Sequence, residues 1–188
     1  MKTIANRIKP ENGSEMTNIK GVLMNPIETF FAVWDREAEK TVQILKTLPP
    51  GQYDFRPDPS GRSLGELAWH LAEVDAYVSF GVATGVFPPD TKPPNIQRPM
   101  TIEALAPGYE RIHQQARERL RMMEPDFERE MKFLDGSSRT VSFLLWDVML
   151  LHSVHHRGQL SLLVRLAGGV VPSLFGPTRE QSQSAVRK

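Results

Sequence analysis

Histidines are the residues of this chain whose spacing points most directly to chemistry. The chain has five, and three of them, His152, His155 and His156, fall within five consecutive positions. On a helix turning ~100° per residue, His152 and His156 lie ~40° apart and one turn apart, so both imidazoles can reach one ion. This spacing is the two-ligand half of a His-x-x-x-His metal site.

The apolar neighbours of the pair predict which way it points. On the same helical projection, Leu145 and Met149 fall within ~60° of His152, whereas Arg157 falls on the opposite side. The pattern therefore predicts that the pair points into the core and that Arg157 faces water. Burying two neutral imidazoles without partners costs about 1–3 kcal/mol per unpaired group, and a metal ion removes most of that penalty.

A third histidine, His70, shares its predicted helical stripe with Leu67 and Val74. On its own, a histidine on an apolar face is more often a hydrogen-bonded core residue than a metal ligand. Polar side chains within ~60° of His70 are candidates for catalysis; they are Glu66, Glu73 and Tyr77.

The remaining histidines have weaker patterns. His155 is displaced ~60° from His152, so we expect it to hydrogen-bond a neighbour or to line a pocket rim. His113 falls on a highly charged helix, where a surface position is expected. The candidate pocket residues are Arg56, Tyr77 and Gln159, with packing or loop anchoring as the alternative for each.

The elements that must position these residues are four predicted helices. A long proline-rich crossover over 87–100 separates the second and third helices, and Asp135-Gly136 predicts a small hairpin before the fourth. Together they predict an all-α four-helix bundle, a fold that builds metal sites from facing helices. The predicted helices are 26–48, 64–83 after a Ser63/Glu66 capping box, 101–123 with a kink or restart at Pro107-Gly108, and 143–166 after a Ser142 cap.

Composition limits the possible functions. The chain has 188 residues, which favours a single bundle domain that spans residues 25–178. Its net charge of +1 predicts no nucleic-acid partner. It has no cysteine, so a metal site cannot use thiolate ligands. The polar first residues and the lack of a long apolar run predict no membrane span and a cytoplasmic protein. Residues 1–24 and 179–188 are expected to be tails.

Two segments resemble the DinB/YfiT-like family of metal-binding four-helix bundles. They are the nine residues from Ser63 to Leu71 and the nine from His152 to Leu160, and weaker matches extend the resemblance over about 26–177. The resemblance implies a ligand set of His70, His152 and His156 around one zinc, nickel, iron or manganese ion. Water or substrate would fill the remaining positions, and members often form homodimers.

The resemblance and the ligand set leave three functions open. The first is activation of a low-molecular-weight thiol for S-transfer to an electrophilic small molecule, as in members of the family. The second is hydrolysis by metal-bound water, with Glu66 or Glu73 as general base. The third is a non-catalytic site that ties two helices together.

Overall fold

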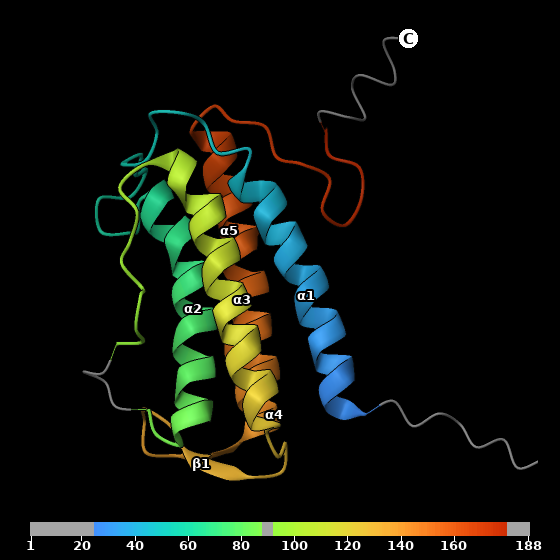
Figure 1. Ribbon diagram of the computed structural model, residues 1–188. Coiled ribbons are helices and arrows are strands. Elements are labelled where there is room, and N and C mark those ends of the chain that lie inside the picture. Colours follow the sequence, from blue (N-terminus) through green and yellow to red (C-terminus); the bar gives the residue numbers. More distant parts are fainter. Residues whose placement is uncertain (1–24, 88–91, 180–188) are drawn as a thin grey trace, which may run out of the picture.

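Four long helical segments run along a common direction, and a small hairpin lies at one end of them (Figure 1). The computed structural model describes residues 25–87 and 92–179. The helices are α1 (Pro26–Leu45), α2 (Leu64–Thr84), the short 3₁₀ turn η1 (Ile102–Ala104), α3 (Leu105–Met123), α4 (Val141–Phe143), the π-helix η2 (Leu144–Leu151) and α5 (His152–Leu166). The last three are consecutive and form one rod. The predicted tail 1–24 and residues 180–188 lie outside the described residues.

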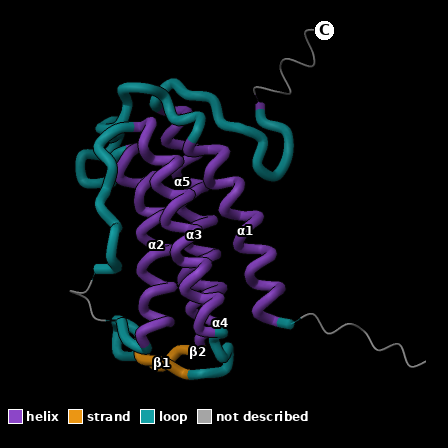
Figure 2. Tube along the Cα trace, in the orientation of Figure 1, coloured by secondary structure: helices purple, strands orange, loops and turns teal. Residues whose placement is uncertain are grey.

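The antiparallel hairpin confirms the remaining part of the predicted fold class. Strands β1 (Glu130–Lys132) and β2 (Ser138–Thr140) pair with Met131 opposite Arg139, and both lie just before the last helical rod (Figure 2). Gly136 takes a positive φ of 76° in the connecting turn, a conformation that only glycine adopts without steric cost. None of the helices within the described ranges combines the length and apolar character that a bilayer span requires.

Helix starts follow the capping rules with two differences from the predictions. The Ser63/Glu66 capping box is present. Helix α3 passes through Pro107 without a restart, because that proline lies in the first turn, where its missing N–H has no intrahelical partner to lose. The last rod is capped by Thr140, whose hydroxyl accepts from the Phe143 N–H at 3.2 Å, and the predicted cap Ser142 lies inside the helix.

The π-helix η2 explains why the predicted direction of the histidine pair is wrong. Its i→i+5 bonding widens the turn, and the His152 N–H reaches the carbonyl of Asp147. The prediction compared His152 with Leu145 and Met149, which lie in this π-helix, and assumed 3.6 residues per turn. That assumption places the core on the wrong side of α5. The buried face of α5 carries Ser153, Arg157, Leu160, Leu163 and Val164, while His152 and His156 are half-buried beside it.

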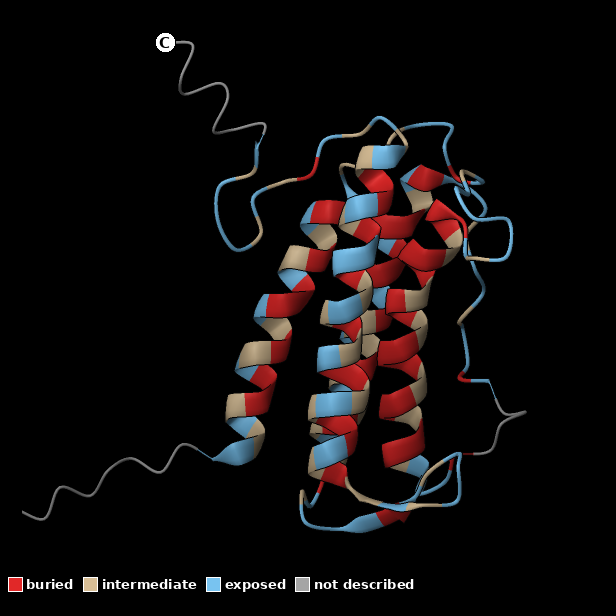
Figure 3. Cartoon of the chain, turned by 180° about the vertical axis from the view of Figure 1, so that it is seen from behind, coloured by how far each residue is buried: buried red, intermediate tan, exposed pale blue. Residues whose placement is uncertain are grey.

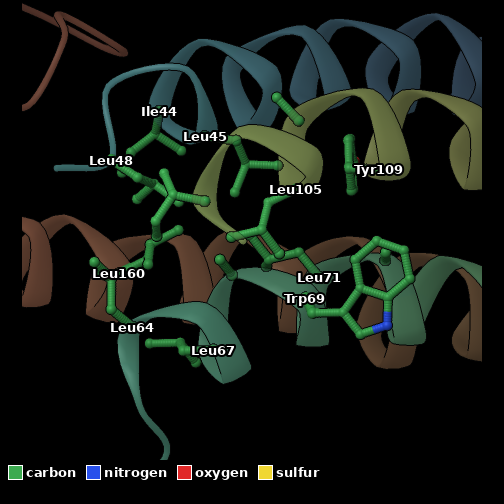
Figure 4. Packing of buried hydrophobic residues seen from close by; sticks show 14 of the residues in the cluster. Ile44, Leu45, Leu48, Leu64, Leu67, Trp69, Leu71, Leu105, Tyr109 and Leu160 are labelled. Atoms are coloured by element: carbon green, nitrogen blue, oxygen red, sulfur yellow. The ribbon is translucent and has the colours of Figure 1, made fainter. Parts of the chain in front are cut away.

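Two apolar clusters fill the bundle. One contains Trp69, Leu71, Leu105 and Leu160, contributed by α2, α3 and α5 (Figure 4). The other contains the aromatic residues of α1 near Phe30 and the apolar residues of η2. In Figure 3 the side of α1 toward the other helices is buried and its outer side is exposed, whereas α2 is buried along most of its length.

Buried polar residues lie between the two clusters. Asp75 is fully buried and accepts hydrogen bonds from Trp34 Nε1 at 3.2 Å, the Tyr109 hydroxyl at 3.3 Å and His113 Nδ1 at 2.9 Å. His113 also donates from Nε2 to Asp35 at 3.3 Å, so it bridges α1 and α2. The prediction that His113 is a surface residue is wrong, because only 12% of its side chain is exposed.

This bridge gives the protein a pH-dependent stability. Burial alone would lower the pKa of His113, but its hydrogen bonds to Asp75 and Asp35, with their charges, raise it above the ordinary 6.5. A raised folded-state pKa means that the stabilisation is complete below about pH 6.5 and is lost as the pH rises through the folded-state value. We expect His113→Gln to lower the free energy of unfolding by about 1.5–3 kcal/mol at pH 6, and by less at pH 8.

Urea denaturation of both proteins in chelator at the two pH values measures this difference. Because both proteins carry His152 and His156, whose pKa values burial lowers, any pH dependence that those two rings add cancels in the difference between the two proteins. An equal loss of stability at both pH values would contradict the assignment of a charged His113.

Candidate metal centre

Three imidazoles from two helices converge at one place. His70 comes from α2, and His152 and His156 come from consecutive turns of α5. Each offers a ring nitrogen, and these three atoms all lie within 4.8 Å of one another. His152 Nε2 and His156 Nε2 are 2.6 Å apart, so one donates to the other. Two nitrogen ligands of a tetrahedral ion, each bound at about 2.0 Å, lie ~3.3 Å apart. The His152 and His156 nitrogens would therefore need to move apart only slightly to bind one ion.

Hydrogen bonds from neighbouring side chains orient two of the three rings. His70 Nδ1 donates to Glu73 Oε2 at 3.3 Å, and His156 Nδ1 donates to Gln159 Oε1 at 2.7 Å. The same amide donates from its nitrogen to His155 Nε2 at 3.0 Å. With Nδ1 protonated, each ring keeps its Nε2 lone pair, which is the arrangement that metal-binding histidines show in proteins.

The protonation states also suit a metal ion. Burial, reinforced by the nearby His70 and His155, lowers the pKa of His152. Burial lowers the pKa of His156 to about 4, although the bond to Gln159 acts in the opposite direction. Both rings are therefore neutral at pH 7, and neutral imidazole is the form that binds a divalent transition metal. The donor set fits such an ion.

An open pocket of about 1010 Å³ adjoins the histidine cluster through two of its members, His70 and His152. His70, Glu73 and Tyr77 line it from α2, and His152 lines it from α5. Its other walls are the crossover residues 92–98 and the apolar side chains of Phe133, Leu134 and Val148. Its size is at the upper end of the usual range for small-molecule sites.

The predicted catalytic candidates occupy different positions. Glu73 lines the pocket, and its pKa is lowered because the hydrogen bond from His70 and the charge of Arg98 outweigh the effect of burial. Tyr77 lines it too, and burial raises the pKa of its hydroxyl, which is therefore protonated at pH 7. Glu66 instead accepts from the Ser63 N–H at 2.8 Å and from Arg56 at 2.8 Å.

These bonds give Arg56 a loop-anchoring role. Its other guanidinium nitrogen binds the carbonyl of Gly61, and it is not among the residues that line the pocket. The structure therefore favours the anchoring alternative for Arg56 over the pocket alternative.

Two arginines that line the pocket, Arg62 and Arg98, were not predicted as site residues from the sequence. Arg98 binds Glu73 at 3.4 Å and Glu66 at 3.5 Å, which holds the crossover against α2. Arg62, just before that helix, is exposed at the pocket rim near His152. The sequence shows a stiff crossover, but the contact between residues 73 and 98 depends on tertiary folding, which no local pattern reveals.

Comparison with known proteins places the chain in one family. Residues 34–160 match the family model of the DinB superfamily. The chain is 25% identical over 162 residues to the protein YrdA of Bacillus subtilis strain 168, covering 85% of this chain and 93% of that protein.

Solved structures agree with this placement. A DinB-like protein from Bacillus cereus ATCC 10987 superposes with a TM-score of 0.64 at 28% identity, covering 78% of this chain and 96% of the other. The DinB-like protein YjoA of Bacillus subtilis, at 20% identity and a TM-score of 0.61 over 80% of this chain and 99% of the other, shares the fold.

Proposed function

Because the chain belongs to the DinB superfamily, we propose that His70, His152 and His156 hold one divalent transition metal ion, and that the protein is a metal-dependent enzyme. The observation that carries the proposal is the convergence of three imidazoles beside an open pocket. Zinc, nickel, iron and manganese are the candidate ions, and the imidazole donors do not select among them. Three protein ligands leave coordination positions for a substrate.

We propose further that the enzyme transfers a low-molecular-weight thiol to an electrophilic small molecule. A metal ion with an open position makes a bound thiol or water more acidic. The pocket volume of about 1010 Å³ offers room for two small molecules. The Tyr77 hydroxyl, protonated at neutral pH, is a hydrogen-bond donor in the pocket wall.

The walls of the pocket suggest what those molecules share. Arg62, Lys92 and Arg98 give one part of the lining a positive charge, whereas Phe133 and Val148 make another part apolar. A substrate pair that carries an anionic group and an apolar body complements these walls. Glu73 and Arg98 hold each other, which leaves the exposed Arg62 and Lys92 as the more accessible cations for an anionic group.

Hydrolysis is the second candidate, and the carboxylates argue against it. A general base must accept a proton from the attacking water, but the hydrogen bonds from His70 and Arg98 outweigh burial and lower the pKa of Glu73, which makes it a weaker base. Glu66 accepts from Ser63 and Arg56. A purely structural metal site is the third candidate, and it would need no pocket beside the ligands.

An assay with a fluorogenic alkyl chloride separates the three candidates. We expect metal-loaded protein to join monochlorobimane to cysteine, glutathione or coenzyme A, with a C–S bond forming as chloride leaves and the thiol proton passing to solvent. Turnover should fall at least 100-fold in chelated protein and in His156→Ala.

The other outcomes favour the alternatives. Metal-dependent cleavage of ester substrates without thiol would support the hydrolase. A protein that binds metal, shows neither activity and unfolds on chelation would support the structural site.

A further inference from the structure

The pocket beside the histidines extends along the bundle toward the hairpin. His70 and Val78 both line it, and the helix between them separates the two positions by about 12 Å along α2. Val148 lines it from η2, and Phe133 and Leu134 line it from the chain just after β1. Figure 1 places the hairpin at the end of the bundle where α2 finishes and the last rod begins. The pocket therefore has a histidine end and a hairpin end.

Aromatic rings form a wall of the hairpin end. Tyr77 and Phe133 line the pocket, and Phe87 packs against both, with its ring centroid 5.9 Å from that of Tyr77 and 5.2 Å from that of Phe133. Gly81 makes room for this packing, because a Cβ at that position would lie 2.1 Å from the Phe87 ring. Since Phe87 is only 7% exposed, it holds the two pocket rings in place before any ligand binds.

Backbone hydrogen bonds of the hairpin fix the chain at Phe133. Its N–H donates to the carbonyl of Ser137 at 3.0 Å, and its carbonyl accepts from the Gly136 N–H at 2.9 Å. The next residue, Leu134, lines the pocket although it is 50% exposed. A large apolar side chain that a fixed turn holds partly in water gains free energy when an apolar ligand covers it.

The charged side chains of the pocket gather at the other end. Within residues 25–87 and 92–179, four charged side chains line it. Glu73 and Arg98 bind each other, and Arg62 lies near His152, so these three belong to the histidine end. The fourth, Lys92, is exposed on the crossover. The side chains that α2, η2 and the hairpin contribute to the hairpin end are apolar or aromatic, so an uncharged apolar group fits there and an ionised group would lose hydration without a partner.

We propose that the hairpin end binds the electrophilic substrate through an uncharged aromatic or branched apolar body, and that Phe133 and Leu134 determine which electrophiles are accepted. The inference rests on the proposed thiol transfer, which identifies the ligand as an electrophile. The two substrates then occupy different ends of one pocket. The anionic group of the thiol lies toward Arg62, and the electrophile lies on the hairpin side with its reactive carbon toward the histidines.

An uncharged aromatic dye tests the apolar subsite without catalysis. We expect N-phenyl-1-naphthylamine to bind chelated protein at about one molecule per chain, with enhanced and blue-shifted emission. Leu134→Asp places a carboxylate in the wall, and Phe133→Ala removes a ring from it. Each should weaken binding about 10-fold or more. Phe175→Ala is the matched control, because Phe175 is 71% exposed, contacts Lys40 and does not line the pocket.

Folding of the variants is checked by circular dichroism. Leu134 is half exposed, so Leu134→Asp keeps the test decisive if Phe133→Ala does not fold. Absence of saturable dye binding to the wild type overturns the proposal. Equal dye affinity in the wild type, Leu134→Asp and the Phe175→Ala control overturns it as well.

Steady-state kinetics with monochlorobimane, an uncharged bicyclic electrophile, assign the two ends. Leu134→Asp should raise the KM for monochlorobimane about 10-fold and change the KM for the thiol by less than about twofold. Arg62→Ala should do the reverse. A rise in the KM for the thiol alone in Leu134→Asp overturns the assignment. A protein that binds the dye in the expected pattern but transfers no thiol supports the apolar subsite and contradicts only the proposed thiol transfer.

Discussion

Replacing His156 by alanine should reduce the metal content of the purified protein from about one ion per chain to less than about 0.1. His156 Nε2 faces His152, and its Nδ1 is held by Gln159. Because loss of an outer hydrogen-bond partner already weakens metal binding by about 10- to 100-fold, loss of a ligand should exceed that range. Metal analysis after dialysis against trace chelator measures the content.

His152→Ala should behave like His156→Ala, while His155→Ala should keep its ion, since the His155 ring contacts Gln159 and is outside the group of three converging nitrogens. Circular dichroism should show native helicity in all three variants. One ion per chain in both His152→Ala and His156→Ala would refute the ligand assignment, and loss of metal in His155→Ala alone would require a different ligand set.

Replacing Arg157 by methionine should lower the free energy of unfolding by about 3–5 kcal/mol. The guanidinium is 2% exposed, and it donates to the carboxylate of Glu37, to the carbonyl of the same residue at 2.7 Å and to the hydroxyl of Thr41 at 3.3 Å. Its removal leaves a buried carboxylate with Lys40 as its nearest cation, at 2.6 Å. We expect a value near 3 kcal/mol because that lysine compensates part of the loss.

Urea denaturation with two further variants separates the causes. The double variant Glu37→Leu with Arg157→Met should recover most of the loss, because an apolar pair needs no charge compensation. Arg121→Met removes an ion pair to Glu28 on the protein surface, and we expect it to cost no more than about 1 kcal/mol. Equal losses in Arg157→Met and Arg121→Met would show that burial of the Glu37 pair has no energetic consequence.

The sequence predicts the helical bundle and the histidine cluster because both depend on local spacing. The four amphipathic stretches, the Ser63 capping box and the turn at Gly136 are each encoded within a few residues. The closeness of His152 to His156 follows from the helical repeat alone. The meeting of His70 with this pair is confirmed geometrically, although the sequence alone supports it only through a family resemblance.

The features that the sequence does not predict depend on contacts between distant segments. On the helical projection Arg157 falls on the side of its helix opposite the apolar stripe, and His113 falls on a highly charged helix, yet their carboxylate partners on α1 and α2 hold them inside the bundle. A guanidinium on a predicted polar face carries no local sign of a buried partner 120 residues away. The π-helical turn before His152 is also invisible to a 3.6-residue period.

The same π-helical stretch makes the histidine cluster sensitive to chain length. Residues 144–151 form the first half of the rod and pack against the apolar cluster that contains the aromatic residues of α1 near Phe30. His152 follows this stretch immediately. Deleting one residue from this stretch would remove the extra residue of a π-helical turn or shift the register of the rod, and either change alters how His152 and His156 face His70. Substitutions are therefore tolerated more easily here than a single-residue deletion, and related chains that keep the three histidines are expected to keep the length of this stretch.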